Sequence, residues 1–264
     1  MKSLERILDV LALFEGQAAE WSVEQLHDAL GFTRSTMYRH LKVLTDAGFL
    51  SVLPGIGYTL GPRIIELDYA IRTRDRLIVA SRPVMMELIE EIPSIALLCR
   101  CYRDRVLCVH QERSTEMFQS NYERGLARPL LYGAASQVIL AHMPPATLAR
   151  LYKAQPAEFA AAQLGADFNE VRETLKRIRR TGCHVSVGQV TKGVTGVAAP
   201  LFDVRENVIG SLSVTIGEPN IPSERLKVIS DRVRFCARIV TNTMSRETFE
   251  PRPPHGTASR SSDA

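Results

Sequence analysis

The sequence lacks any long uninterrupted apolar run and has only five cysteines among its 264 residues. A membrane helix needs about 18 consecutive apolar residues, whereas the best candidates, GVTGVAAPLF and VIGSLSVTIG, are short and broken by glycine. The N-terminus carries Glu5, Asp9 and Glu15 within its apolar pattern and has no small-residue cleavage site, so it predicts a folded helix and not a signal peptide. An odd cysteine count in a chain of this length does not indicate a secreted disulfide framework. These absences predict a cytoplasmic protein with reduced thiols and no membrane partner.

A large excess of charge of one sign is also absent. The chain has 33 Lys and Arg against 29 Asp and Glu, a net charge of +4. A basic balance favours a polyanionic partner, but residues 1–61 hold five basic against seven acidic side chains. Net charge therefore does not identify a nucleic-acid partner, and any such site has to come from the local placement of cations.

The apolar periodicity of the first sixty residues predicts three helices and a β-hairpin. The first helix ends near Gly16, Ser22 is expected to cap a second that ends at Gly31, and Thr33 is expected to cap a third that ends at residues 47–48. Two short strands, FLSVL and YTL, then flank the turn residues 54–57.

The third of these helices has one apolar and one basic face. At 100° per residue, Met37, His40, Leu41 and Leu44 share one side, while polar and basic side chains without an acid gather opposite. A short helix, a tight turn and this second helix match a helix-turn-helix that enters the major groove of DNA, with the hairpin as a wing. We expect arginine and lysine to bind guanine edges or phosphates, and hydroxyls near the helix start to bind phosphates. The candidate DNA contacts are Ser22, Thr33, Arg34, Ser35, Thr36, Tyr38, Arg39, Lys42, Gly55 and Gly57.

The remaining chain predicts a linker helix over 62–80, a larger α+β region over 81–248 and a disordered tail over 249–264. Its expected strands and helices form a mixed sheet flanked by helices. The expected strands cover 95–102, 106–111, 184–187, 194–202 and 208–216, with a possible further strand at 117–122. The expected helices cover 84–92, 133–142, 145–152, 169–181 and 222–246.

Several stretches resemble the IclR family of bacterial transcriptional regulators. They are KSLERILDVLALFE, the run from WSVEQLHDALGF to GPRIIEL, RPLLYGAASQVILAHMP, RRTGCHVSVGQVTKGVTGVAAPLFD and VIGSLSVTIG, so the resemblance covers about residues 2–246. It implies a winged helix-turn-helix over 1–61, a linker helix, and a GAF-like domain that binds an effector and forms oligomers. It further implies homodimers or homotetramers that bind double-stranded operator DNA and respond to a small-molecule effector.

The chain departs from the family at two places in the effector domain. Members commonly show His-Ala-Thr/Ser-Ala-x-Gly-Lys at a helix start, but Leu131 and Gln137 stand here in place of the His and the Lys. An acidic cluster common before the VAAP strand is replaced by Ser186, Val187, Gly188 and Gln189. These replacements indicate an effector with fewer charged partners.

Small residues at the predicted helix start leave backbone N–H groups for a carboxylate. We therefore expect a small organic acid, with aromatic acids as one candidate class, between this segment and the last strands. It would be the effector of a regulator that controls a catabolic operon. The equally weighted alternative is that the small residues only allow close helix packing and that Arg128 is a surface cation. The candidate effector contacts are Arg128, Tyr132, Gly133, Ala134, Ala135, Ser136, Gly196, Ser211 and Ser213.

The cysteines and histidines bear on two other classes of function. Cys99 and Cys101 alternate on one predicted strand with Cys108 across the turn, which is compatible with a thiol- or metal-responsive regulator but is more often simple packing. The histidines are scattered without a nucleophile motif, a metal-binding HExxH or a phosphate loop, so we expect no enzyme, no metal and no cofactor, and a GAF-fold enzyme is the least favoured alternative.

Overall fold

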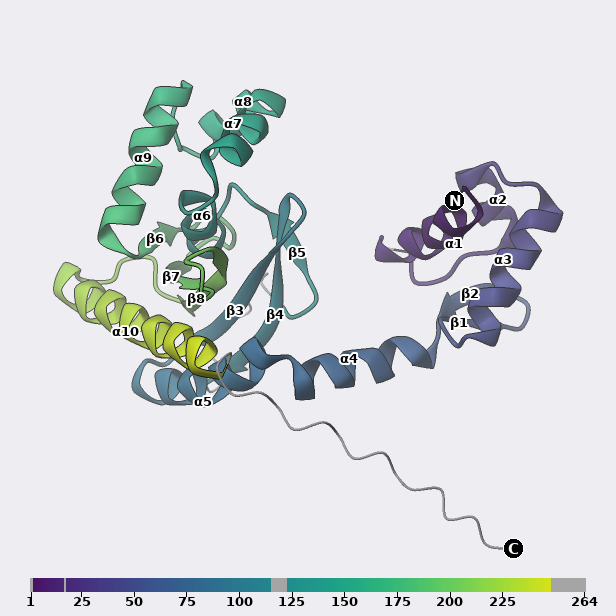
Figure 1. Ribbon diagram of the computed structural model, residues 1–264, viewed down its shortest axis with the longest axis horizontal. Coiled ribbons are helices and arrows are strands. Elements are labelled where there is room, and N and C mark those ends of the chain that lie inside the picture. The colour runs from purple at the N-terminus through teal and green to yellow at the C-terminus, as the bar shows by residue number, and fades with distance from the viewer. Residues whose placement is uncertain (1, 17, 115–122, 248–264) are drawn as a thin grey trace, which may run out of the picture. The chain divides into compact units, whose positions relative to one another are not determined.

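The computed structural model describes residues 2–16, 18–114 and 123–247 (Figure 1). It divides the chain into two compact units, Met1–Asp75 and Arg76–Ala264, which are described separately. Each unit has its own hydrophobic core. The predicted strand at 117–122 and the predicted tail lie outside the described residues.

Unit 1 is a small helical domain with a hairpin. Its core is made by apolar side chains of the first three helices and the first strand, among them Val10, Leu26, Met37 and Leu50. The elements are α1 (Lys2–Ala12), the 3-10 helix η1 (Leu13–Glu15), α2 (Val23–Leu30), α3 (Arg34–Asp46), β1 (Leu50–Leu53), β2 (Gly57–Leu60) and α4 (Pro62–Arg74).

The predicted helix caps are confirmed. The Ser22 hydroxyl accepts from the Gln25 amide at 3.2 Å, and the Gln25 side chain accepts from the Ser22 amide at 2.8 Å, which forms a reciprocal capping box. Gly31 ends α2 in the left-handed conformation, and Thr33 caps α3 through the Thr36 amide. Local sequence signals therefore set the boundaries of the helix-turn-helix.

The expected linker helix over 62–80 is corrected to two helices. α4 ends at Arg74 because Asp75 is extended, and α5 (Arg76–Glu91) begins at the next residue, well before the expected start at residue 84. Pro83 lies inside α5. Its missing N–H and its ring normally disfavour a helix, but packing of α5 against the sheet and the C-terminal helix offsets that cost.

Unit 2 is built on one six-stranded sheet in the order β5-β4-β3-β8-β7-β6. All five pairings are antiparallel, so the expected mixed sheet is corrected to an antiparallel one, while the α+β class is confirmed. The strands are β3 (Ile95–Tyr102), β4 (Arg105–Arg113), β5 (Ala127–Pro129), β6 (His184–Val187), β7 (Thr195–Phe202) and β8 (Val208–Ile216). The three-residue β5 was not expected from the sequence.

Helices cover both faces of this sheet (Figure 1). Alternate strand residues face opposite layers: Leu97 belongs to the core under α6 and α9, whereas Ala96 and Leu98 belong to the core under α5 and α10. The helices are α6 (Ala134–Ala141), α7 (Pro145–Ala154), α8 (Pro156–Ala161), α9 (Phe168–Thr181) and α10 (Ser223–Glu247). Of these, the six-residue α8 was missed by the sequence analysis.

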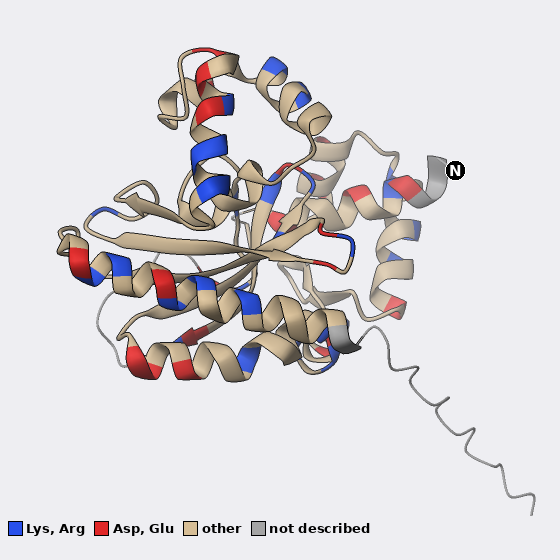
Figure 2. Ribbon diagram, turned by 60° about the vertical axis from the view of Figure 1, so that its left-hand side comes forward, with Lys and Arg blue, Asp and Glu red and all other residues tan. Residues whose placement is uncertain are grey.

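Lysine and arginine recur along α10 and in the last turns of α9 (Figure 2). Among the described residues, none of the helices combines the length and the apolar character that crossing a bilayer requires.

Candidate functional site

The outer face of α3 carries the predicted DNA-reading side chains. Met37, His40, Leu41 and Leu44 are buried, as the helical wheel predicted. The opposite side exposes Arg34, Ser35, Tyr38, Arg39 and Lys42 to solvent. Burial of the apolar stripe thus fixes which side chains α3 can present to a ligand.

The hydroxyl groups at the start of α3 bond to one another. Thr33 Oγ1 lies 2.9 Å from Thr36 Oγ1 and 3.3 Å from Ser35 Oγ. Ser22, at the start of α2, lies 3.0 Å from a Glu24 carboxylate oxygen. A backbone hydrogen bond at the helix start, and then this contact with Ser22, lower the pKa of Glu24. Ser22 therefore has a capping role, while the three hydroxyls of α3 form one polar cluster at a helix N-terminus.

The expectation that the basic face contains no acid is corrected at its end. Lys42 Nζ lies 3.0 Å from Asp46 Oδ2, four residues along α3, and both side chains are largely exposed. An exposed pair of this kind contributes little stability, at most about 1 kcal/mol. A phosphate therefore competes with Asp46 for the lysine at small cost.

His40 forms the inner support of α3. Its ring is buried and meets Phe32 edge to face at 5.9 Å, and the Arg6 guanidinium lies 5.3 Å from the Phe32 ring. Burial first, and then Arg39 and Arg6, lower the pKa of His40. The imidazole is thus neutral at pH 7 and belongs to the core.

The hairpin glycines have different roles. Gly55, at the tip, has φ +78° and open space around the position of a Cβ. Gly57 has φ +149°, and a Cβ there would lie 2.2 Å from the Trp21 carbonyl oxygen, because Trp21 and Tyr58 exchange backbone hydrogen bonds of 2.9 and 3.0 Å. The structure therefore gives Gly57 a packing role, and only Gly55 is open to a partner.

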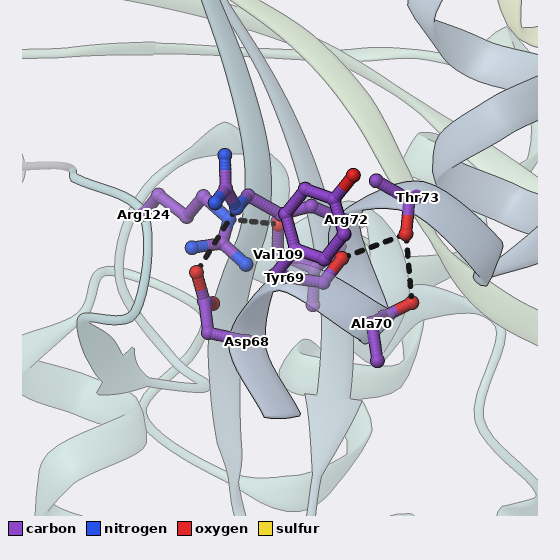
Figure 3. Close-up of polar contacts among 7 residues, drawn as sticks. All are labelled: Asp68, Tyr69, Ala70, Arg72, Thr73, Val109 and Arg124. Carbon is purple, nitrogen blue, oxygen red and sulfur yellow. Dashed lines mark hydrogen bonds and ion pairs between the residues drawn. The ribbon is translucent and has the colours of Figure 1, made fainter. Parts of the chain in front are cut away.

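Helix α4 has no buried residue. Its apolar side chains Ile65 and Tyr69 are 71% and 60% exposed. Arg72 Nε lies 3.0 Å from Asp68 Oδ2, and Thr73 donates to the Tyr69 carbonyl at 2.8 Å, both within the helix (Figure 3). The helix is held by its own polar contacts and leaves apolar surface uncovered in the single chain.

A small cavity in unit 2 lies where α6 begins above the sheet. It offers about 40 Å³ to the centres of water-sized molecules, room for very few waters. The lining is formed by small, apolar and uncharged polar residues, without a charged side chain. The lining residues are Leu97, Gly133, Ala134, Ala135, Ser186, Gln189, Val190, Thr191, Val194, Gly196, Ser213 and Thr215.

Two backbone amides at the start of α6 are already bonded to side chains. The Gly133 amide donates to Gln189 Oε1 at 2.9 Å, and the Ala134 amide donates to Ser186 Oγ at 2.9 Å. Gln137 Nε2 also donates to Gln189 Oε1, at 3.2 Å, and to the Leu131 carbonyl at 2.8 Å. The side-chain oxygen of Gln189 thus accepts two hydrogen bonds, from the Gly133 amide and from Gln137 Nε2. The oxygen of a bound ligand could accept from the same two donors.

The two serines of β8 differ in their hydrogen bonding. Ser211 Oγ donates to the Ala135 carbonyl at 3.0 Å, so it ties α6 to the sheet. Ser213 is 3% exposed, lines the cavity, and its Oγ has no hydrogen-bond partner among the described residues. An unsatisfied buried hydroxyl costs about 1–3 kcal/mol, and a polar ligand in the cavity would remove that cost.

Arg128 and Tyr132 do not reach this cavity, which corrects their predicted place beside Gly133. Both line a separate hollow, where Tyr132 Oη donates to Glu158 at 3.1 Å. Burial, and then this contact with Glu158, raise the pKa of Tyr132. Arg128 lies on β5 at one edge of the sheet, two strands from β3, the nearest strand that lines the cavity, and thus roughly 10 Å away at the usual strand spacing. Ser136 and Ser211 are buried nearby without lining the cavity.

Several lining residues were missed by the sequence analysis. Thr215 continues the alternation of Ser211 and Ser213 on β8, a two-residue period that could have indicated it. Ser186 and Gln189 were noted only as departures from a family pattern. Their contact with α6 bridges 52 and 56 residues of sequence, which local patterns do not reveal.

Three of the five cysteines are buried, and Cys101 and Cys183 are partly buried. Cys99 and Cys108 are fully buried and face each other on β3 and β4, and none of the five cysteines forms a disulfide. Burial, and then Asp104, raise the pKa of Cys101, which disfavours the thiolate that metal binding and redox chemistry need. No group of three or more metal-ligating side chains occurs within the described parts of the chain.

Comparison with known proteins agrees with this geometry. The family model for the IclR helix-turn-helix domain matches residues 3–54, and the model for the bacterial transcriptional regulator IclR C-terminal domain matches residues 70–242. The chain is similar to the HTH-type transcriptional regulator BhcR of Paracoccus denitrificans, with 26% identity over 90% of this chain and 85% of the relative.

Two solved structures share the fold. An IclR-type transcriptional regulator from Alicyclobacillus acidocaldarius has a TM-score of 0.77 and 21% identity, covering 93% of this chain and 99% of the other. An IclR homologue from Microbacterium hydrocarbonoxydans, complexed with 4-hydroxybenzoate, has a TM-score of 0.75 and 19% identity, covering 92% and 98%. With both family models matched in order along one chain, this protein belongs to the IclR family of bacterial transcriptional regulators.

Proposed function

We propose that this protein is a ligand-responsive, sequence-specific regulator without catalytic activity, which binds operator DNA through α3 and the β1–β2 hairpin. The observation that carries the proposal is the division of α3, whose apolar stripe is buried while Arg39 and Lys42 are exposed. A helix of this kind enters the major groove, where guanidinium and ammonium groups bind guanine edges or phosphates. The cluster of Thr33, Ser35 and Thr36 lies at the helix start, where phosphates bind.

We infer that the effector is a small organic acid bound at the start of α6. The supporting observations are the amide donors of Gly133 and Gln137 and the unsatisfied hydroxyl of Ser213. Neutral donors and a helix N-terminus suit a single carboxylate better than a highly charged ligand. A carboxylate oxygen would take the place of the Gln189 amide oxygen.

An aromatic acid is the class we favour, and it needs the cavity to enlarge. Small-molecule sites usually measure about 300–1,000 Å³, far more than the 40 Å³ present here. Residues 188–194, between β6 and β7, contribute Gln189, Val190 and Val194 to the wall, so displacement of this segment would open the site. The homologue bound to 4-hydroxybenzoate shares the fold and supports this class of ligand.

We further propose that the protein acts as a homodimer or homotetramer and controls a catabolic operon. The exposed apolar side chains of α4 support self-association, since a single chain leaves them in water. A symmetric dimer presents two α3 helices to the two halves of a palindromic operator.

Isothermal titration of the full-length protein with aromatic and aliphatic carboxylates tests the effector. We expect heat from at least one aromatic acid, and several-fold tighter binding by Gln189→Ala, because the ligand no longer competes with the amide oxygen. Lys192→Ala is the matched control, since Lys192 lies on the same segment but does not line the cavity. The absence of binding heat with every acid tested would contradict the carboxylate proposal.

DNA binding is tested separately, by footprinting on the DNA upstream of the gene for this protein. A protected palindrome whose occupancy changes with the effector is the expected result. The absence of any protected sequence would remove the operator proposal while leaving the ligand result intact.

A further inference from the structure

We propose that unit 2 contains a second ligand site, a cationic groove that binds an organic dianion with a flat apolar part. The groove lies between α9, α10 and the end of β7 and has a volume of about 640 Å³, within the usual range for small-molecule sites. Its wall includes Arg179, Arg234, Arg238, His142, Phe202 and Phe235. None of these residues contributes to the cavity at the start of α6.

Two of the arginines are held in place by helix ends. Arg179 Nη1 donates to the Ala141 carbonyl, the last residue of α6, at 2.9 Å. Arg234 Nη1 donates to the Thr181 carbonyl, the last residue of α9, at 3.0 Å. Each bond uses one of the five N–H donors of a guanidinium, so the group is fixed in position and most of its donors remain for other partners.

Positive charge in the groove exceeds negative charge. Asp231 is the one acid in the wall, and it pairs with Arg234. Arg179 and Arg238 have no carboxylate within ion-pair distance among the described residues. Elsewhere on α10, Arg225 pairs with Glu218, and Arg232 pairs with Glu91. Arg179 of α9 and Arg238 of α10 thus line one groove without a carboxylate partner. With three arginines against one aspartate in its wall, the groove favours a ligand with two negative charges.

The rest of the wall is aromatic and neutral. Phe202 meets the His142 ring edge to face at 5.2 Å, and Phe235, 44% exposed, lies 5.8 Å from the Arg238 guanidinium. These rings offer an apolar surface to a flat ligand. Phosphate and carboxylate groups are both recognised by paired guanidinium donors, so the shared chemistry is an aromatic dianion.

His142 adds a hydrogen-bond acceptor to this wall. Its Nδ1 lies 2.8 Å from the Val138 carbonyl, so the neutral ring carries its proton there and leaves Nε2 as the acceptor. Burial is the main cause that lowers the pKa of His142, although the Val138 bond opposes the shift, and Arg179 lowers it further. The ring is therefore neutral at pH 7 and suits a ligand that also has a hydroxyl group.

The groove and the small cavity lie at opposite ends of α6. Gly133 and Ala134 at its start line the cavity, while the carbonyl at its end is bonded by Arg179. At 1.5 Å per residue, the eight residues of α6 separate them by roughly 12 Å. A ligand in the groove would therefore act on α6, as the proposed effector does, but through different residues.

Isothermal titration of the full-length protein with phenyl phosphate and with phthalate tests the site, with inorganic phosphate and phenol as partial ligands. We expect at least one aromatic dianion to bind more tightly than either partial ligand. Arg238→Ala and Arg179→Ala should each weaken that binding by about tenfold or more, the usual effect of losing a charge-assisted hydrogen bond. Arg180→Ala is the matched control, because Arg180 is exposed next to Arg179 but does not line the groove.

Each outcome decides the proposal. Loss in Arg238→Ala with none in Arg180→Ala supports the site even if Arg179→Ala destabilises α6, and the preferred dianion identifies a phosphate or a dicarboxylate ligand. No binding by either dianion, or an equal loss in Arg180→Ala, overturns it. A changed sedimentation coefficient of Arg238→Ala with unchanged dianion binding also overturns it, and identifies the groove as a contact between subunits.

Discussion

The two units of this protein place their candidate chemistry in opposite environments. Unit 1 presents it on the exposed face of α3. Unit 2 encloses it in a cavity, where the side chain of Ser213 is only 3% exposed. Their net charges also contrast: residues 1–75 have eight basic against ten acidic side chains, and residues 76–264 have 25 against 19.

This contrast shows that the net charge of a unit does not predict the charge of its candidate binding site. The net-negative unit presents the cationic face proposed for DNA, whereas in the net-positive unit the cavity proposed for the effector is lined by no charged residue. A binding partner responds to the few side chains within its reach, because solvent and salt screen charges beyond about 10 Å. The contrast also implies that substitutions of exposed site residues in unit 1 leave its stability intact, whereas substitutions of buried, hydrogen-bonded site residues in unit 2 change stability and binding together.

Gly57→Ala is the strongest exception to the expectation that site substitutions in unit 1 leave stability intact, because Gly57 is a predicted DNA contact that also has a packing role. A Cβ 2.2 Å from the Trp21 carbonyl in an unfavourable backbone conformation should lower the stability of unit 1 by about 3 kcal/mol or more. Trp21 is the single tryptophan of the chain and lies at the clash, so its fluorescence during urea unfolding reports on this unit.

Gly55→Ala is the matched control, since it has open space around its Cβ and only the cost of its φ of +78°. It should lower stability by about 1 kcal/mol. Equal effects of the two substitutions would contradict the packing role of Gly57.

Acid should weaken unit 2 through His184. Burial lowers its pKa from 6.5 to about 4, so below pH 6.5 the unfolded chain takes up a proton before the folded one does. The stability that the neutral ring contributes is complete above pH 6.5 and is lost between pH 6.5 and 4, to a total of roughly 3 kcal/mol. Urea unfolding followed by far-UV circular dichroism measures it, and His184→Leu should remove this part of the loss; an identical pH profile in that variant would refute it.

Arg39→Ala tests whether DNA binding by unit 1 depends on the exposed face of α3. It should weaken operator binding by about 10- to 100-fold, the range for losing a contact to a base, without changing the unfolding curve, because Arg39 is exposed. Arg74→Ala removes the same charge from α4 and is the control. Equal losses in fluorescence anisotropy titrations would attribute the effect to net charge and not to the face of α3.

The smallest expected effects distinguish the two serines of β8. Ser211→Ala should lower stability by about 1 kcal/mol through loss of its bond to α6. Ser213→Ala should leave stability unchanged or slightly raise it, because it removes an unsatisfied hydroxyl, yet it should weaken effector binding several-fold. Thermal melts and titration on the same samples measure both, and a destabilised Ser213→Ala with normal binding would contradict the assignment.

Much of unit 1 could be predicted from the sequence because its signals are local. The caps at Ser22 and Thr33 and the apolar stripe of α3 act within one or two helical turns. The end of α4 at Arg74 and the continuation of α5 through Pro83 were not predictable in this way. At Pro83, tertiary packing outweighs the local preference of proline.

The candidate effector site was predicted only in part. Gly133, Ala134, Ala135, Gly196 and Ser213 do line one cavity, but Arg128 lies at the far edge of the sheet. Proximity in sequence to Gly133 was misleading, because the chain turns at Gly133, with φ +86°, between β5 and α6.

The sequence by itself determined the order of the elements, the family, and which face of α3 is exposed, because helical period, caps and turns depend on neighbouring residues. Only the tertiary structure decided that Gln137 and Gln189, at two positions where the family commonly has a lysine and an acidic cluster, share one hydrogen bond, and that Ser213 is left without one. It also decided that Arg179 of α9 and Arg238 of α10 line one groove. The physical reason is that a sheet with five antiparallel pairings brings together segments far apart in the chain, and strand order is not encoded in any single segment.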